Sequence, residues 1–166
     1  MDTTDAGGPI HVLDVEYLGR RSAIAAALIE GRAGAAIVDP GPATALPGLR
    51  DRLAERGCTM YDLEAVLLTH IHLDHAGATG TLVRENPRLR VYVHARGAPH
   101  LADPSRLLAS AARLYGTELE RLWGEVAAVP PDAIHALDGG EALRVAGHAL
   151  DVAYTPGHAW HHVAYF

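Results

Sequence analysis

A short segment of the chain, Thr69–His75, is rich in side chains that bind metal ions. Three histidines and one aspartate fall within six of its residues: His70, His72, Asp74 and His75. In an extended strand His70 and His72 point to the same side, because successive side chains alternate between the two faces. A tight turn after them can bring Asp74 and His75 to a neighbouring point. Imidazole and carboxylate groups suit zinc, iron or manganese, so the segment predicts a site for two adjacent metal ions.

A second segment, Thr155–His158, offers a partner for the first. Its proline and glycine favour a sharp turn directly after a predicted strand. That turn would aim His158 at the metal position of His70 and His72. Three histidine ligands leave one coordination position open for water, which is the form of a catalytic zinc site.

The elements that must position these groups begin with three apolar segments joined by short links. They predict the first strands of an antiparallel sheet, at residues 10–18, 24–29 and 34–38. A helix follows over residues 46–56, where leucines recur near helical spacing, a proline suits the first turn and a glycine follows the end.

The middle of the chain alternates strands and helices. The apolar run 65–68 predicts a buried strand that leads straight into the histidine segment, followed by a helix over 77–85 and a strand over 89–93. This order predicts a parallel sheet covered by helices. The histidines then lie at the C-terminal end of a central strand, where open α/β sheets place their sites.

Residues 103–125 interrupt this pattern with two predicted helices. Asp103-Pro104 is typical of an N-cap and first helical residue, and Thr117–Glu120 has capping-box spacing. We expect this helical pair to cover the site as a lid, with Tyr115 and Trp123 either packing the helices together or contacting a substrate. Strands are predicted beyond the lid over 142–145, 148–154 and 162–166.

The segment His70–His75 matches the His-x-His-x-Asp-His signature of the metallo-β-lactamase-fold hydrolases, and Thr155–His158 resembles their third-histidine turn. Asp39, before Pro-Gly, resembles the family's earlier aspartate, which supports the metal loops by hydrogen bonds; otherwise it caps a turn. The resemblance covers nearly the whole chain. It implies an α/β fold, the αβ/βα sandwich, of which this chain holds the first half and the start of the second.

The same resemblance implies the ligand roles. His70, His72 and His158 would bind the first metal, and Asp74 and His75 the second. Zinc is the first expectation, with two ions in the complete enzyme, while iron or manganese would also fit. A hydroxide held by the metal would attack a carbonyl group, and Asp74 would orient it and pass a proton to the leaving group.

The chain also departs from the family pattern. The second metal of the family takes a bridging aspartate and a further histidine, but only eight residues follow His158 and none is an aspartate. We expect residues 1–166 to be one domain of this fold, shortened at its C-terminus. Three explanations remain. The chain is a fragment of a longer enzyme, a truncated gene product with a degenerate site, or a chain whose fold a second copy completes through strand exchange. An open sheet edge near Phe166 favours a homo-oligomer.

The resemblance implies a metal-dependent hydrolase of a small ester, thioester or lactone, with glyoxalase-II-like thioester hydrolysis first and lactone hydrolysis second. One alternative is an iron-dependent sulfur dioxygenase of the same fold. Another is an inactive, truncated domain with a partial metal site. His94 and His100 either line the substrate pocket or are solvated loop residues, and His161 and His162 are expected at the surface or the pocket rim.

The composition of the chain limits which other functions are expected. The net charge of −6 and the lack of a basic run argue against nucleic-acid binding, so the expected partner is a small molecule. We expect no membrane contact, because no long apolar run exists, and a cytoplasmic location, because the first residues are polar. The one cysteine, Cys58, excludes an intrachain disulfide and is expected to be a small apolar filler.

Overall fold

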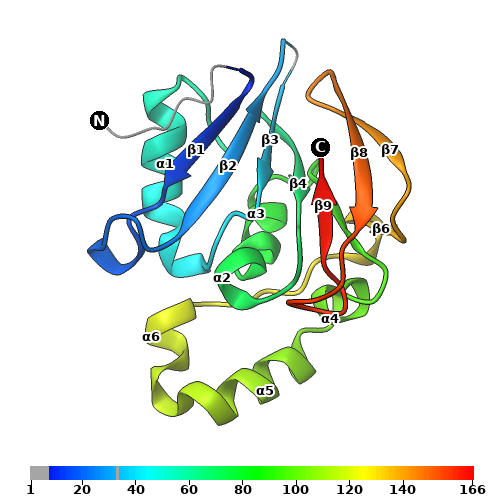
Figure 1. The fold of residues 1–166 in the computed structure, drawn as a ribbon. Helices are drawn as coiled ribbons and strands as arrows, with labels where there is room; N and C mark the ends of the chain where they lie inside the picture. Colours follow the sequence, from blue (N-terminus) through cyan, green and yellow to red (C-terminus); the bar gives the residue numbers. More distant parts are fainter. Residues whose placement is uncertain (1–7, 33) are drawn as a thin grey trace.

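The structure is a computed structural model that describes residues 8–32 and 34–166. Two β-sheets with flanking helices make up this part of the chain (Figure 1). The larger sheet has the strand order β1 (Ile10–Asp14), β2 (Ala25–Glu30), β3 (Ala35–Val38), β4 (Leu63–Leu67), β5 (Arg90–His94) and β6 (Ile134–Leu137). The smaller sheet has the order β7 (Ala142–Val145), β8 (His148–Tyr154) and β9 (Val163–Tyr165). The mixed α/β architecture agrees with the prediction.

The larger sheet changes from antiparallel to parallel pairing at β3. The pairs β1–β2 and β2–β3 are antiparallel, whereas β3–β4, β4–β5 and β5–β6 are parallel. The predicted antiparallel start and parallel middle are therefore confirmed, while β6 had not been predicted. Because β3, β4 and β5 run in parallel, their C-terminal ends meet at one edge of the sheet.

The first predicted strand, over 10–18, was too long. It ends at Asp14, and a short 3-10 turn, η1 (Tyr17–Gly19), follows. Glu16 and Leu18 have φ of 48° and 50°, which is left-handed backbone that no strand can contain.

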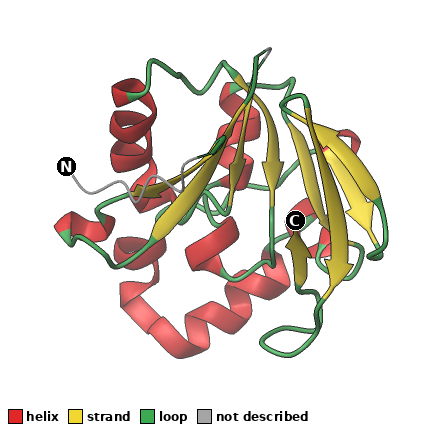
Figure 2. Ribbon diagram, turned by 45° about the horizontal axis from the view of Figure 1, so that its top comes forward, coloured by secondary structure: helices red, strands yellow, loops and turns green. Residues whose placement is uncertain are grey.

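The helices pack on one face of the larger sheet or beyond its C-terminal edge (Figures 1 and 2). They are α1 (Leu46–Glu55), α2 (Leu73–Ala76), α3 (Thr79–Glu85), α4 (Ala98–Ala102), α5 (Ser105–Tyr115) and α6 (Leu119–Trp123), with 3-10 turns η2 (Ala43–Ala45), η3 (Gly116–Glu118) and η4 (Pro131–Ala133). Among residues 8–32 and 34–166, no helix is long and apolar enough to cross a membrane.

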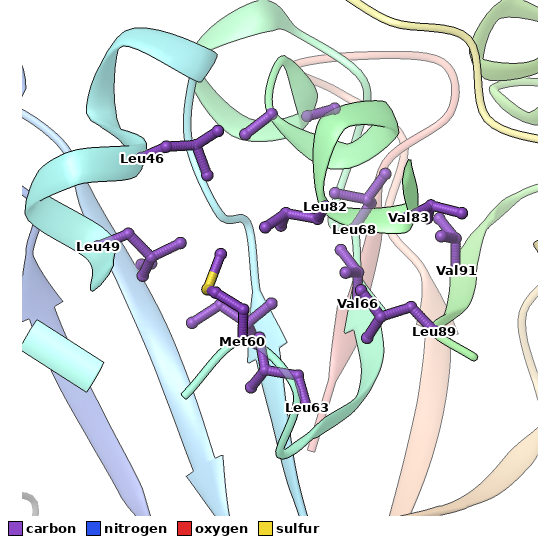
Figure 3. Packing of buried hydrophobic residues seen from close by; sticks show 14 of the residues in the cluster. Leu46, Leu49, Met60, Leu63, Val66, Leu68, Leu82, Val83, Leu89 and Val91 are labelled. Atoms are coloured by element: carbon purple, nitrogen blue, oxygen red, sulfur yellow. The ribbon is translucent and has the colours of Figure 1, made fainter. Parts of the chain in front are cut away.

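Strand β4 lies between two apolar layers, which explains its continuous apolar sequence. Val66 packs with Leu82 of α3 in the layer between sheet and helices (Figure 3). Ala65 and Leu67, on the opposite face, pack with Val152 of the smaller sheet. Burial of a valine or leucine side chain contributes about 1.5–3 kcal/mol, so these two layers hold β4 firmly in place.

The predicted helix over 77–85 is confirmed as α3, which begins two residues later, and a short helix that had not been predicted precedes it. Helix α2 begins at Leu73, within the histidine segment, and α3 begins at Thr79. A helix of four residues is too short to show an apolar repeat, so the sequence carries no periodic signal for α2.

The two lid helices exist, but their ends differ from the prediction. Pro104 takes the N-cap position of α5 instead of the first helical position, and Asp103, one residue earlier, accepts the Ser105 N–H at 3.1 Å. No capping box forms at Thr117–Glu120, because the 3-10 turn η3 joins the helices and α6 has no side-chain cap.

Helix α6 is anchored to the turns of the first sheet. The hydroxyl groups of Tyr17 and Thr44 both donate to the carbonyl oxygen of Leu122, at 3.0 and 2.7 Å. The Trp123 ring stacks on Tyr17 with centroids 5.9 Å apart. These contacts fix the second lid helix beside the C-terminal edge of the larger sheet.

Candidate metal centre

The histidine segment leaves the sheet at the C-terminal end of β4. Leu68 still donates its N–H to Tyr92 of β5, and the Thr69 carbonyl accepts the N–H of Val163 from β9. His72 keeps an extended backbone, with φ −62° and ψ 151°, and is the residue before α2. The change from strand to helix therefore falls inside the segment and separates His72 from the groups on α2.

Three histidines, His70, His72 and His158, meet at one point, and we call them the histidine cluster. His72 Nδ1 lies 3.1 Å from His70 Nε2 and 3.1 Å from His158 Nε2. In a tetrahedral zinc site with bonds of about 2.0–2.1 Å, ligand nitrogens lie roughly 3.3 Å apart. The donor set and spacing of the histidine cluster therefore fit one divalent ion.

The hydrogen bonds around Thr69 set the tautomer of His70. The Thr69 hydroxyl donates to Asp39 Oδ2 at 2.6 Å, so it can accept from His70 Nδ1, which lies 2.9 Å away. His70 Nε2 then carries the lone pair that faces the cluster. Burial, followed by the charges of His75 and His72, lowers the pKa of His70 to about 3, so its imidazole is neutral near pH 7.

The pKa of His72 changes in the same direction as that of His70. Its pKa is lowered, first by burial and then by the charge of His158. A neutral imidazole is the form that binds a metal ion, so the fold prepares both side chains for ligation.

Asp39 ties the loop after β3 to the histidine segment. Its carboxylate accepts the Thr69 N–H at 2.8 Å, the Thr69 hydroxyl at 2.6 Å and His75 Nδ1 at 2.9 Å. Its φ of 48° is left-handed, a conformation that aspartate tolerates better than most residues. The next glycine, Gly41 with φ 85°, accepts from Ala78 and donates to His75 with its backbone. Asp39 thus hydrogen-bonds the loops of the histidine segment from behind, and its support of a metal centre stays a prediction.

His75 lies between two carboxylates. Its Nδ1 is 2.9 Å from Asp39 Oδ2, and its Nε2 is 3.4 Å from Asp74 Oδ2. Burial acts to lower the pKa of His75, but the hydrogen bonds to Asp39 and Asp74 outweigh it and raise the pKa to about 9. The hydrogen bond from His75 in turn lowers the pKa of Asp74. In the metal-free protein, His75 is therefore a cation near pH 7, and it must lose a proton before it can bind a metal.

Among the described residues, two sets bring ligand atoms within 4.8 Å of one another: the histidine cluster, and Asp39 with His70 and His75. Asp74 belongs to neither set. A second metal on Asp74 and His75 stays a prediction.

The loop that carries His158 is held from both sides. Thr155 N–H donates to the His162 carbonyl at 3.0 Å, and Thr155 Oγ1 lies 2.8 Å from His162 Nδ1. The Tyr154 hydroxyl donates to the Trp160 carbonyl at 2.9 Å. These contacts close the loop across its base and its tip, which fixes where His158 points.

His94 does not fill either role expected of it. It is buried, its ring stacks on Tyr154 with centroids 4.6 Å apart, and its Nδ1 accepts the N–H of Arg96 at 3.1 Å. The expectation of a solvated or pocket-lining His94 was therefore wrong. Arg96 also donates to the Tyr154 hydroxyl at 3.3 Å, so these two residues support the loop that carries His158.

A cavity of about 530 Å³ opens beside the histidine cluster, between α2 and the two lid helices. His72 and Asp74 line it on the metal side, and Tyr115 and Trp123 line it on the lid side, where a pocket role was predicted. His161 lies in its wall, and burial followed by the charge of His72 lowers the pKa of His161 to about 4.

Two further lining residues, His100 and Arg106, stood differently in the sequence analysis. His100, for which a pocket-lining and a solvated loop position were both expected, belongs to the lining and lies on α4. Arg106, on α5, had not been singled out. Its position on a helix with many exposed residues carries no sequence signal for a pocket.

The fold and the site together indicate a metal-binding protein of the α/β class, and the comparison with known proteins agrees with this. Residues 19–166 match the metallo-beta-lactamase superfamily, so the chain belongs to that superfamily. It is similar to the probable metallo-hydrolase YqgX of Bacillus subtilis, with 36% identity over 114 residues that span 69% of this chain and 47% of YqgX. It is 33% identical to a hydroxyacylglutathione hydrolase of a Synechococcus species over 134 residues, 81% of this chain and 39% of that enzyme.

Solved structures agree on the fold. The FEZ-1 metallo-beta-lactamase from Legionella gormanii matches with a TM-score of 0.72 at 16% identity, over 95% of this chain and 54% of that one. BJP-1 of Bradyrhizobium japonicum matches with a TM-score of 0.71 at 20% identity, over 95% and 53%. The chain spans less than half the length of the two curated relatives named above.

Proposed function

We propose that this chain supplies the metal centre of a metal-dependent hydrolase that cleaves a small ester, thioester or lactone. The observation that carries the proposal is the spacing of the three cluster nitrogens, 3.1 Å for each neighbouring pair, on imidazoles of which two have lowered pKa values. Similarity to hydroxyacylglutathione hydrolases supports a thioester as the first choice. A lactone is our second candidate.

In this proposal His70, His72 and His158 hold one divalent ion, with zinc as first choice and iron or manganese as alternatives. When bound, such an ion activates a water molecule as nucleophile and polarises a carbonyl group. A second ion on Asp74 and His75 belongs to the complete enzyme and requires His75 to lose its proton.

Asp74 is the proposed group for proton transfer. Its pKa is lowered, chiefly by the hydrogen bond from His75, so the carboxylate is ionised near pH 7. Its side chain is 45% exposed and lines the same cavity as His72. A carboxylate at this place can accept a proton from the attacking water and return it to the leaving group.

The cavity supports a small substrate. Its volume of about 530 Å³ is within the range of small-molecule sites, roughly 300–1,000 Å³. Apolar side chains on the lid side would exclude water from the reacting group and hold an organic segment.

The test combines elemental analysis with hydrolysis assays on thioester, lactone and activated-ester substrates. We expect bound zinc and hydrolysis in the unmodified protein, and loss of both in His72→Ala. His135→Gln is the matched control, because His135 is exposed on β6 and outside both metal groups. Stoichiometric iron with oxygen uptake would favour the sulfur dioxygenase instead. Zinc binding without any hydrolysis would leave the inactive-domain alternative.

A further inference from the structure

The cavity beside the histidine cluster has two chemically different sides. At one side lie His72 and Asp74, next to the proposed reaction centre. Most of the wall between α2 and α5 is apolar and includes Leu73, Leu107 and Leu114. An organic segment can therefore lie along α5, the helix that crosses below α2 in Figure 1.

A cation without a partner lies on the lid side. Arg106 lines the cavity from the first turns of α5, and its guanidinium makes no hydrogen bond or ion pair with any residue that the structure describes. The charge of Arg106 contributes, after the hydrogen bonds with Ser105, to lowering the pKa of Asp103. Asp103 is fully exposed and already accepts the N–H of Ser105. By contrast, Arg84 and Arg121 of neighbouring elements are both paired with glutamates.

The cavity lining lacks the excess of negative charge that the whole chain carries, because its one acid is balanced by Arg106. The chain has a net charge of −6, yet Asp74 is the only acid among the lining residues, and it lies on the metal side. His100 adds a polar donor to the side of Arg106. A guanidinium presents several N–H donors in a plane and matches a carboxylate or another oxyanion.

The lid side also carries an unused donor. Nε1 of Trp123 is buried and has no hydrogen-bond partner among the described residues, although its residue lines the cavity. An indole N–H can only donate, and this one is closed off from the cavity, so Arg106 remains the accessible donor for an anion on the lid side.

We propose that this cavity selects substrates that combine an apolar segment along α5 with an anionic group, separate from the reacting carbonyl, that is bound by Arg106. The inference rests on the proposed hydrolase function, and it names the substrate class of that site. A neutral ester of equal length would bind the same walls but leave Arg106 without a partner.

The first experiment compares two substrates of matched length. One is the mono-para-nitrophenyl ester of glutarate, which has a terminal carboxylate, and the other is para-nitrophenyl pentanoate, which has none. Arg106→Gln should lower kcat/KM for the glutarate ester by about threefold to tenfold, mainly through KM, and leave the pentanoate ester unchanged. Arg113→Gln is the matched control, since Arg113 is on the same helix but outside the cavity lining. The longer adipate and suberate esters locate the best spacing.

Equal losses for the charged and the neutral ester in Arg106→Gln would overturn the inference, as would no loss along the whole ester series. A sulfate or phosphonate in place of the terminal carboxylate tells which oxyanion Arg106 prefers. Raising the salt concentration should weaken the charged ester selectively, because the exposed guanidinium is screened.

The second experiment measures binding without turnover. The chain has two tryptophans, so Trp160→Phe leaves Trp123 as the fluorescent reporter in the cavity wall. Hexanoate should shift Trp123 emission at lower concentration than hexan-1-ol, and Arg106→Gln should remove that difference. If Arg106→Gln leaves the affinity for hexanoate unchanged, the carboxylate of hexanoate binds at the histidine cluster instead of at Arg106. That result would overturn the inference.

The two experiments separate the inference from the proposed function. Arg106-dependent hexanoate binding without hydrolysis of any ester would refute the hydrolase and keep the anion site. Hydrolysis of both ester types without an Arg106 effect would keep the hydrolase and refute the anion site.

Discussion

Replacement of Asp39 by asparagine should change how the stability of the metal-free protein depends on pH. Burial acts to lower the pKa of His75, but the hydrogen bonds to Asp39 and Asp74 raise it to about 9, above the ordinary 6.5. A protonated His75 therefore stabilises the fold fully below pH 6.5, and this stabilisation is lost as the pH rises through 9. Asparagine tolerates the left-handed φ of 48° and keeps the size of the side chain, but it removes the charge that holds the proton.

The size of this contribution to the unfolding free energy follows from the pKa of His75. The rise from 6.5 to about 9 corresponds to an upper limit of about 3 kcal/mol, at about 1.4 kcal/mol per pH unit. The His75 side chain is 33% exposed, so solvent screening reduces this, and we expect about 1–2 kcal/mol. In Asp39→Asn only the longer contact to Asp74, at 3.4 Å, remains, so the alkaline loss should fall to less than about half.

The assay is urea unfolding of chelator-treated protein at about pH 6.5 and about pH 9.5. Asp51→Asn removes the same charge from an exposed position on α1 and should behave like the unmodified protein. If Asp39→Asn loses as much stability on the alkaline side as the unmodified protein, His75 is not held protonated by Asp39 and the reasoning fails. Equal unfolding free energies of the unmodified protein at both pH values would refute the reasoning as well.

Three further predictions concern the loop, the metal and the core. Tyr154→Phe removes the hydroxyl that binds the Trp160 carbonyl, so zinc should bind several-fold more weakly while the unfolding midpoint changes little; unchanged affinity in a zinc titration would exclude a positioning role. Zinc bound only by the histidine cluster should release few protons near pH 7.5, whereas an ion that also takes His75 should release about one, which calorimetry in two buffers distinguishes. Leu82→Ala, at a fully packed position between α3 and β4, should cost about 2–5 kcal/mol of unfolding free energy without changing metal stoichiometry, and a loss under 1 kcal/mol would contradict the packing in Figure 3.

The part of the site that depends on local patterns was predictable. Strand alternation places His70 and His72 together, and a proline-glycine turn brings His158 to them; the structure has these nitrogens 3.1 Å apart. The parallel middle of the sheet followed in the same way from the alternation of strands and helices.

What was missed depends on contacts between distant segments. His94 is buried because Tyr154, 60 residues later, stacks on it. His75 is a cation largely because the fold brings Asp39, 36 residues earlier, within 2.9 Å of its ring, and no spacing in the sequence encodes that distance. Arg106 lines a cavity whose other walls come from α2, α4, α6 and the loop of His161, and no local pattern encodes the approach of these segments.

The histidine cluster draws its members from both sheets. His70 and His72 follow β4 of the larger sheet, whereas His158 follows β8 of the smaller one. An ion held by all three is therefore a cross-link between the two layers, in addition to the apolar layer of Leu67 and Val152. Ion binding and the docking of the smaller sheet are then one thermodynamic equilibrium. Removing the ion should first loosen β7, β8 and β9, which amide hydrogen exchange would register as faster exchange there than in the larger sheet.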